Sequence, residues 1–200
     1  TVLDLICGRT RASAGSIKYK GQELTRLSES AIVQAGVGRK FQTPSVFEDL
    51  TVFENLEISF PRGRTVFGSL TFQRDQLVKD RVEEVAEMIF LKDKLNTYAD
   101  ELSHGQKQWL EIGMLLIQDP DLLMLDEPVA GMSVSERAKT AELLNRIIKN
   151  RSVLVIEHDM TFVRELGVKV TCLHEGTVLA EGTIDQVSSN ERVIEVYLGR

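Results

Sequence analysis

Cysteine is scarce in this 200-residue chain: the two thiols, Cys7 and Cys172, stand far apart. Their separation fits no metal-binding spacing and apolar residues flank both, so we expect reduced core thiols in a cytosolic protein. No apolar run approaches the roughly 18 residues that span a bilayer, and the first segment lacks the pattern of a signal peptide. Any membrane association is therefore expected to come through a partner protein.

An excess of basic residues is also missing. Lysine and arginine number 24 against 30 aspartates and glutamates, which gives a net charge of −6 and a pI near 5.2. Nucleic-acid binders usually carry a basic face, so we expect no nucleic-acid partner. Repeats and low-complexity linkers are absent as well, and the hydrophobic fraction of 42% allows a substantial core. The length suits one α/β domain, or a core with a small lobe.

A polar loop with the sequence LSHGQ, residues 102–106, leads directly into a helical pattern. Ser103 can cap the start of that helix, and Gly105 lets a ligand come close to the backbone. The helix has one apolar face, formed by Leu110, Met114 and Ile117. Its start offers free N–H groups and the positive end of a dipole, which favours an anion such as phosphate. An ordinary capped helix would give the same pattern.

An unbroken apolar run, LLML at 122–125, ends in Asp126 and Glu127 and is stopped by Pro128. Such a run is typical of a strand buried on both faces in a parallel sheet. Ligands of open α/β sheets bind at the carboxyl ends of strands, where these two acids lie. Adjacent residues point to opposite faces, so one carboxylate could hold Mg²⁺ while the other orients or deprotonates a water. A strand exit into solvent is the open alternative.

Together, the helix start at 102–106 and the strand that ends in Asp126 and Glu127 resemble the signature motif and the Walker B motif of ABC-type ATPases. The family consensus Leu-Ser-Gly-Gly-Gln appears here with His104 in place of the first glycine. The resemblance implies an α/β fold class: a P-loop NTPase-like parallel sheet core that lacks its N-terminal strands, with an inserted α-helical subdomain. The implied division is a RecA-like ATPase core at 1–42 and 120–200, and a helical subdomain with the signature motif at 43–119.

The first eight residues, TVLDLICG, predict a helix with Gly8 near its C-terminal cap. ABC ATPases carry Gly-x-x-x-x-Gly-Lys-Ser/Thr before a similar helix. In that register Thr1 directly follows the Ser/Thr that binds Mg²⁺, and the N-terminus is truncated within the phosphate loop. The resemblance therefore implies that Thr1 contacts nucleotide, and that the chain as it stands binds ATP poorly and is inactive alone.

Two more polar residues follow predicted strands. Gln42 ends the strand predicted at 37–41, where it could reach Mg²⁺ or its water, or simply be a solvated loop residue. His158 follows the buried strand predicted at 152–156. Their positions resemble the Q-loop glutamine and the switch histidine of the family. Met132 departs from the family pattern, because the D-loop often ends in Asp there.

The remaining patterns predict mostly helices. They comprise helices at 30–34, 51–60, 76–91, 161–167 and 191–200, a capping box of Ser133 and Glu136 that opens a helix reaching Asn150, an apolar stripe of Leu77, Val78, Val82, Val85, Met88 and Ile89, a short strand at 17–20, and a hairpin at 173–182 that turns at Glu175-Gly176.

The resemblance implies a mechanism of positioning and electrostatics. Two copies, or this chain and a related one, close head to tail, with each ATP between the phosphate loop of one and the 103–106 loop of the other, which comprises Ser103, His104, Gly105 and Gln106. Asp126 helps hold Mg²⁺ through water, and Gln42 contacts the metal. Glu127 acts on the attacking water, and His158 steadies the γ-phosphate.

Partners and substrate follow from the same resemblance. Besides a second ATP-binding subunit, it implies membrane-spanning permease subunits that insert a short helix into a groove of the helical subdomain. Phe41, Val46 and Phe47 could line that groove, and core packing is the alternative for each of them. The chain would then lie at the cytoplasmic face of the membrane as a peripheral subunit. The segments VAGM, VIEHDM, AEGT and VIEVYLG are similar to importers of branched-chain amino acids and urea, and LSHGQKQWLEIGMLL favours the urea type.

Two other hypotheses stay open. A soluble ABC protein, such as a ribosome-associated factor, would carry two tandem cassettes and basic extensions, and this acidic single cassette has neither. A non-catalytic fragment would keep the fold and dock partners but hold ATP poorly. Charge-assisted hydrogen bonds to phosphate contribute roughly 1.5 to 3 kcal/mol each, so a missing phosphate loop would weaken ATP binding by several decades.

Overall fold

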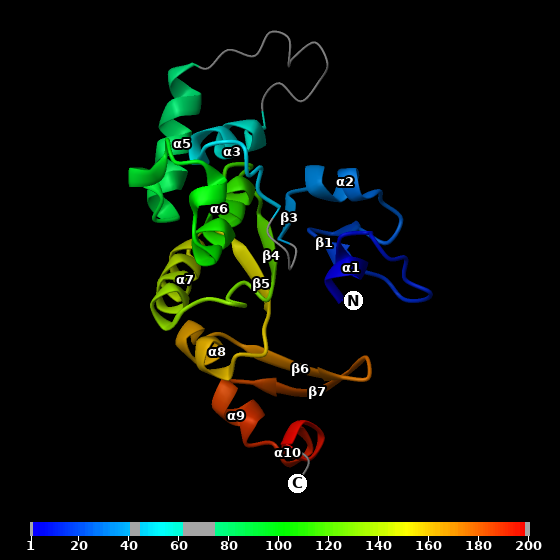
Figure 1. Cartoon of the computed structure of the whole chain (residues 1–200). Helices are drawn as coiled ribbons and strands as arrows, with labels where there is room; N and C mark the ends of the chain where they lie inside the picture. The colour runs from blue at the N-terminus through cyan, green and yellow to red at the C-terminus, as the bar shows by residue number, and fades with distance from the viewer. Residues whose placement is uncertain (1, 41–44, 62–74, 199–200) are drawn as a thin grey trace.

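A three-stranded parallel sheet organises the molecule, and its strands lie in the order β3-β4-β5 (Figure 1). The computed structural model describes residues 2–40, 45–61 and 75–198. The strands are β3 (Val37–Lys40), β4 (Leu122–Asp126) and β5 (Ser152–Ile156). Val37 pairs with Leu122, and Asp126 pairs with Ile156, so the strands run in register to a common carboxyl edge. The predicted α/β class with a parallel sheet is confirmed.

The central strand β4 separates two hydrophobic clusters. Met124 packs in a small cluster with Leu3 and Ile32, whereas Leu123 and Leu125 belong to a large cluster on the other face. All three β4 residues are fully buried, as the apolar run predicts for a strand covered on both faces. The small cluster lies under α1 (Val2–Ile6), the hairpin of β1 (Lys18–Tyr19) and β2 (Gln22–Glu23), and α2 (Glu29–Gln34).

The large cluster is built mainly from helices, which lie on the opposite side of the sheet from α1 and α2 (Figure 1). They are α3 (Val52–Ser59), α5 (Gln76–Met88), α6 (His104–Leu116), α7 (Val134–Ile147) and α8 (Met160–Leu166), with short 3₁₀ turns η1 (Lys92–Lys94) and η2 (Ala99–Glu101). The predicted stripe of α5 is confirmed at Val78, Val82 and Val85, which are fully buried. It is wrong at Leu77, which is 51% exposed because it lies about 100° around the helix from Val78.

The two ends of α7 differ in how closely they follow the prediction. Ser133 and Glu136 form the predicted capping box at the start of α7. The predicted end at Asn150 is wrong, since α7 ends at Ile147. The Asn150 N–H bonds the Ile147 carbonyl in a tighter i to i−3 turn, which closes the helix earlier.

The strand β5 was expected to be buried, and this expectation is wrong. Its residues alternate: Val153 and Val155 pack against the large cluster, while Leu154 and Ile156 are each 36% exposed. Only one face of β5 is covered by the described residues, because the large cluster packs on that face and the small cluster includes no residue of β5. A half-covered strand shows the period of two, whereas a fully covered one does not.

The C-terminal part is a hairpin followed by two helices. It comprises β6 (Val170–His174), β7 (Thr177–Gly182), α9 (Ile184–Ser188) and α10 (Glu191–Leu198). The predicted turn is confirmed: Glu175 and Gly176 have φ values of 47° and 78°, as a two-residue hairpin turn requires. Across the three described ranges, every helix is too short or too polar to traverse a bilayer.

Both cysteines are free thiols, as expected, but neither is a buried core residue. Each is half-buried, and the Cys7 sulfur accepts a hydrogen bond from Arg39 Nη1 at 3.0 Å. The apolar neighbours of Cys7 in sequence gave no sign of this contact, because Arg39 comes from a different element, β3.

Candidate active site

The carboxyl ends of β4 and β5 bring together residues that the sequence singles out. Asp126 is the last residue of β4, and Glu127 follows with a φ of 45°. The Glu127 N–H donates to the Ile156 carbonyl at 2.9 Å, which joins the two strand ends. A positive φ is uncommon outside glycine and tends to occur at functional sites, where surrounding contacts hold it.

Glu127 and His158 face each other across this edge. The distance from His158 Nδ1 to Glu127 Oε1 is 3.3 Å, and the side chains are 76% and 35% exposed respectively. The two predicted catalytic residues are therefore adjacent, and both can be reached from solvent. We call Asp126, Glu127 and His158 the strand-end cluster.

Arg39 partly neutralises Asp126. Arg39 Nη2 lies 3.6 Å from Asp126 Oδ2, and Nη1 lies 2.7 Å from Asp4 Oδ1 on α1. The guanidinium is only 9% exposed, and its hydrogen bond holds the pKa of Asp4 below its usual range. Arg39 thus joins α1 to the end of β4 and faces the carboxylate that is predicted to hold a metal.

Lys40, the last residue of β3, is a fully buried cation. Its Nζ lies 3.5 Å from Glu111 Oε2 on α6, and burial lowers the pKa of Lys40 although Glu111, Asp126 and Glu157 counteract the effect. Because β3 leads towards Gln42 and α6 starts at the signature loop, this ion pair connects two predicted parts of the site. Sequence reasoning missed it, since no local pattern pairs Lys40 with Glu111.

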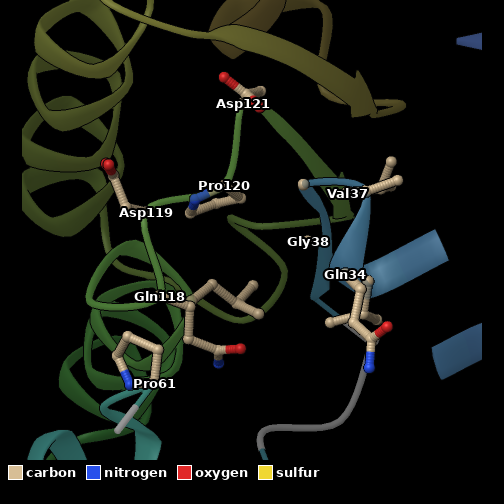
Figure 2. A pocket seen from close by; sticks show the side chains of 12 residues that line it. Gln34, Val37, Gly38, Pro61, Gln118, Asp119, Pro120 and Asp121 are labelled. Carbon is tan, nitrogen blue, oxygen red and sulfur yellow. The ribbon is translucent and has the colours of Figure 1, made fainter. Parts of the chain in front are cut away.

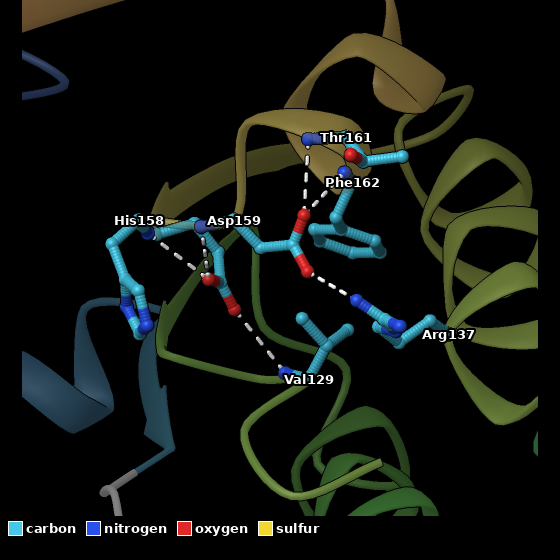
Figure 3. A network of polar contacts seen from close by, with 7 residues as sticks. Val129, Arg137, His158, Asp159, Thr161 and Phe162 are labelled. Carbon is cyan, nitrogen blue, oxygen red and sulfur yellow. Dashed lines mark hydrogen bonds and ion pairs between the residues drawn. The ribbon is translucent and has the colours of Figure 1, made fainter. Parts of the chain in front are cut away.

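The turn after β5 is held by a network of polar contacts (Figure 3). Glu157 accepts hydrogen bonds from the backbone N–H groups of Val129, His158 and Asp159. Asp159 caps α8 and pairs with Arg137 on α7. The N–H of Phe162, followed by the Arg137 guanidinium, lowers the pKa of Asp159. Neither Glu157 nor Arg137 was among the predicted site residues.

The side chains of the signature loop, Ser103–Gln106, form hydrogen bonds with other groups of the same chain. Ser103 and Gln106 form a capping box at the start of α6, and Ser103 Oγ donates to Glu136 Oε1 at 2.9 Å. Hydrogen bonds from Ser133, the backbone N–H first, lower the pKa of Glu136. A Cβ atom at Gly105 would collide with the Glu136 carboxylate. The group that comes close to the Gly105 backbone in this structure is therefore Glu136.

His104 contacts the segment that resembles the D-loop. Its Nε2 lies 3.1 Å from the Ala130 carbonyl oxygen, and a Cβ at Gly131 would lie 3.2 Å from the same ring. Met132, the residue that departs from the D-loop pattern, is buried, and its sulfur accepts a hydrogen bond from Thr140 Oγ1 at 3.2 Å. His104, which stands where the family consensus has glycine, thus links the signature loop to the segment that resembles the D-loop within one chain.

Three predicted residues, Thr1, Phe41 and Gln42, lie outside the described residues. Of the others, the structure brings Glu127 and His158 together beside Asp126, and it brings the signature loop to Ala130 and Glu136. Within the described ranges, no group of three or more His, Cys, Asp or Glu side chains could hold a metal ion.

A cavity of about 330 Å³ lies at the opposite edge of the sheet (Figure 2). Its lining includes Val37 and Gly38 at the start of β3, and Pro120 and Asp121 just before β4. Ligands of open α/β sheets bind at the carboxyl edge, so this cavity is separate from the strand-end cluster.

Comparison with known proteins identifies the family. Residues 1–130 match the family model described as ABC transporter, and residues 177–200 match branched-chain amino acid ATP-binding cassette transporter. The chain is 34% identical over 208 residues to the high-affinity branched-chain amino acid transport ATP-binding protein LivG of Escherichia coli K12, covering all of this chain and 82% of the relative. It is 32% identical over 210 residues to BraF of Pseudomonas aeruginosa, a protein of the same description, with the same coverage.

Comparison with solved structures supports the same family. A nucleotide-free ATP-binding cassette from an ABC transporter superposes with a TM-score of 0.84 at 26% identity, covering all of this chain and 83% of the other. The ADP conformation of an ATP-binding cassette gives 0.82 at 28% identity, covering all of this chain and 82% of the other. The resemblance seen in the sequence is confirmed at this level: the chain belongs to the ABC transporter family and is an ATP-binding cassette similar to those of branched-chain amino acid transporters.

Proposed function

We propose that this protein hydrolyses ATP to drive uptake of a small solute, as the cassette of an ABC importer. The observation that carries the proposal is the pairing of Glu127 with His158 at the carboxyl edge of the sheet, 3.3 Å apart. A carboxylate and an imidazole that are both accessible, at the edge where open α/β sheets bind ligands, suit the handling of a water and a phosphate. The family relationship supports the same reaction class.

Each residue of the strand-end cluster takes a separate role. Glu127 orients the attacking water towards the γ-phosphate and takes a proton from it. His158 Nδ1 or Nε2 donates to a γ-phosphate oxygen while the ring stays beside Glu127. Both roles depend on fixed geometry, because positioning and electrostatics supply most of the rate enhancement in phosphoryl transfer.

Asp126 fits a water-mediated magnesium contact. Mg²⁺ in nucleotide sites keeps several waters and uses one or two carboxylates besides the phosphates. The Asp126 side chain is 19% exposed, and its Oδ2 lies 3.6 Å from Arg39 Nη2. This ion pair is long, so the carboxylate can still accept hydrogen bonds from the waters of a hydrated cation. Mg²⁺ would supply charge neutralisation on the phosphates, and we propose that Gln42 and Thr1 also face it or the nucleotide.

The signature loop acts across an interface with a second cassette. Ser103, His104, Gly105 and Gln106 form the N-terminal turn of α6, whose N–H groups and dipole favour the γ-phosphate held by the partner. To donate to that phosphate, Ser103 Oγ must leave Glu136, which it now contacts. Dimer closure therefore exchanges an internal hydrogen bond for one to the nucleotide.

We also retain the division into a core at 1–42 and 120–200 and a helical subdomain at 43–119. Phe47 in that subdomain is 50% exposed and offers apolar surface to a helix of a permease subunit. The protein would thereby be held at the cytoplasmic face of the membrane. LivG and BraF are named for branched-chain amino acid transport, so we place these amino acids ahead of urea as the substrate.

Mg-ATP binding by calorimetry, together with phosphate release, tests the proposal on the full-length protein. We expect binding and steady hydrolysis. If the full-length protein neither binds nor hydrolyses ATP, the non-catalytic docking alternative replaces the proposal.

A further inference from the structure

Glu157 bridges two backbone segments of the candidate site. It follows β5 directly, and its two carboxylate oxygens face different partners. Oε1 accepts the Val129 N–H at 3.2 Å, whereas Oε2 accepts the N–H groups of His158 at 3.1 Å and Asp159 at 3.4 Å. One side chain thus joins the turn after β4 to the turn after β5.

These are the turns that carry Glu127 and His158. Val129 lies two residues after Glu127, and His158 is the residue next to Glu157. The direct backbone link between the strand ends is the bond from the Glu127 N–H to the Ile156 carbonyl, at 2.9 Å. The Glu157 carboxylate adds a second link to the backbone of the turn after β4, through the Val129 N–H.

The side chain of His158 depends on this backbone support. It is 76% exposed, so packing contacts do little to fix its direction. Its backbone is held on one side by Glu157 and on the other by Asp159, which pairs with Arg137 on α7. A carboxylate suits the bridge because both of its oxygens accept hydrogen bonds, whereas an amide has only one acceptor oxygen.

We propose that Glu157 is a positioning residue for ATP hydrolysis, which keeps His158 beside Glu127 by tying their two turns together. The inference rests on the proposed function, since it requires that Glu127 and His158 act on water and phosphate. Glu157 acts through the backbone N–H groups of both turns and takes no part in the chemistry itself.

The first test is Glu157→Gln in the full-length protein, because this change keeps the shape and removes one of the two acceptor oxygens. We expect faster amide hydrogen exchange at Val129 or at His158 and Asp159, with an unchanged unfolding temperature. The kcat should fall about tenfold, roughly the rate equivalent of one lost hydrogen bond, while KM changes less than about twofold. If Glu157→Gln does not fold, Glu157→Asp carries the same test, since its shorter arm cannot reach both turns.

A double-mutant cycle with His158→Ala separates positioning from general stabilisation. In single-turnover measurements, which resolve slow rates, Glu157→Gln should lower the rate less than about twofold when His158 is already absent, because coupled residues are not additive. An equal tenfold loss in both backgrounds would overturn the inference, since Glu157 would then act independently of His158.

Glu23→Gln is the matched control. Glu23 Oε1 accepts the backbone N–H groups of Ile17 and Thr25, at 3.1 and 3.3 Å, in the β1–β2 hairpin. This variant should leave kcat unchanged. Unaltered hydrogen exchange in Glu157→Gln, or altered exchange with wild-type kcat, contradicts the inference. Absence of hydrolysis by the wild-type protein contradicts the proposed function instead, while the exchange result still reports on the bridge.

Discussion

The strand-end cluster and the signature loop differ in where their hydrogen-bonding groups are directed. Glu127 and His158 face each other with accessible side chains, while backbone contacts hold their turns. In the signature loop, the Ser103 hydroxyl donates to Glu136, and the His104 ring contacts the Ala130 carbonyl. One region leaves its reactive groups available, and the other satisfies them within the chain.

This difference suggests a division of labour. The strand-end cluster is assembled by parallel strands that end together, so one chain is sufficient to build it. The signature loop must first release Glu136 before Ser103 can reach a phosphate. Under the proposed function, each cassette positions its own catalytic residues, and ATP hydrolysis proceeds when two cassettes pair.

The largest expected effect is on the strand-end cluster. His158→Ala should lower kcat about 100- to 1,000-fold, the range found when a preorganised hydrogen-bond donor is removed. Steady-state phosphate release measures the change. His174→Ala is the control, because His174 lies on β6 beside Tyr197 with a ring separation of 6.5 Å. Similar losses in both variants would contradict a specific role for His158.

The Lys40–Glu111 pair connects the two regions through β3 and α6. Lys40→Met leaves the buried Glu111 carboxylate without its 3.5 Å partner. The free energy of unfolding should fall by about 3 kcal/mol, whereas the double variant Lys40→Met/Glu111→Leu should recover to within about 1 kcal/mol of wild type or exceed it. Urea denaturation measures both values. If the double variant instead loses as much free energy of unfolding as the two single variants together, Lys40 and Glu111 do not stabilise each other.

On the signature loop, Ser103→Arg should affect association rather than nucleotide binding within the same chain. Loss of a charge-assisted hydrogen bond should weaken ATP-driven pairing of cassettes about 10- to 100-fold. Sedimentation velocity with Mg-ATP, alone and with the related cassette of the transporter, measures pairing, and calorimetry measures ATP affinity. Unchanged pairing would remove Ser103 from its proposed role.

The smallest effect concerns pH. The pKa of Asp159 is lowered from 3.8 in the folded state, first by the Phe162 N–H and also by Arg137. The unfolded state therefore binds the proton more readily, so this contribution to stability is present above pH 3.8 and is lost as the pH falls through the lower, folded pKa. Denaturant unfolding should show a steeper acid loss for wild type than for Asp159→Asn. Parallel curves for the two proteins would contradict this contribution.

Local sequence chemistry predicts the elements and much of the strand-end cluster. The apolar run of β4 predicts its burial, and Asp126 and Glu127 lie at its end. The same reasoning failed for β5, since an apolar composition does not reveal whether both faces are covered. Leu154 and Ile156 are partly exposed because burial depends on neighbouring elements.

The missed contacts have a different cause. Glu136 was expected only as the capping residue of α7, yet it also binds Ser103, 33 positions away in sequence. Glu157 reaches Val129 across 28 positions. Spacing patterns detect periodic faces and local caps. These long-range hydrogen bonds appear only when β4 and β5, and α6 and α7, are placed together.

The most direct test of the account is Glu127→Gln, with bound ATP and released phosphate measured on the same sample of full-length protein. We expect Mg-ATP affinity close to wild type and phosphate release slowed at least about 100-fold, since the amide cannot take a proton from water. Turnover near the wild-type rate with ATP bound would contradict the role of Glu127 and, with it, the assignment of the strand-end cluster as the catalytic site.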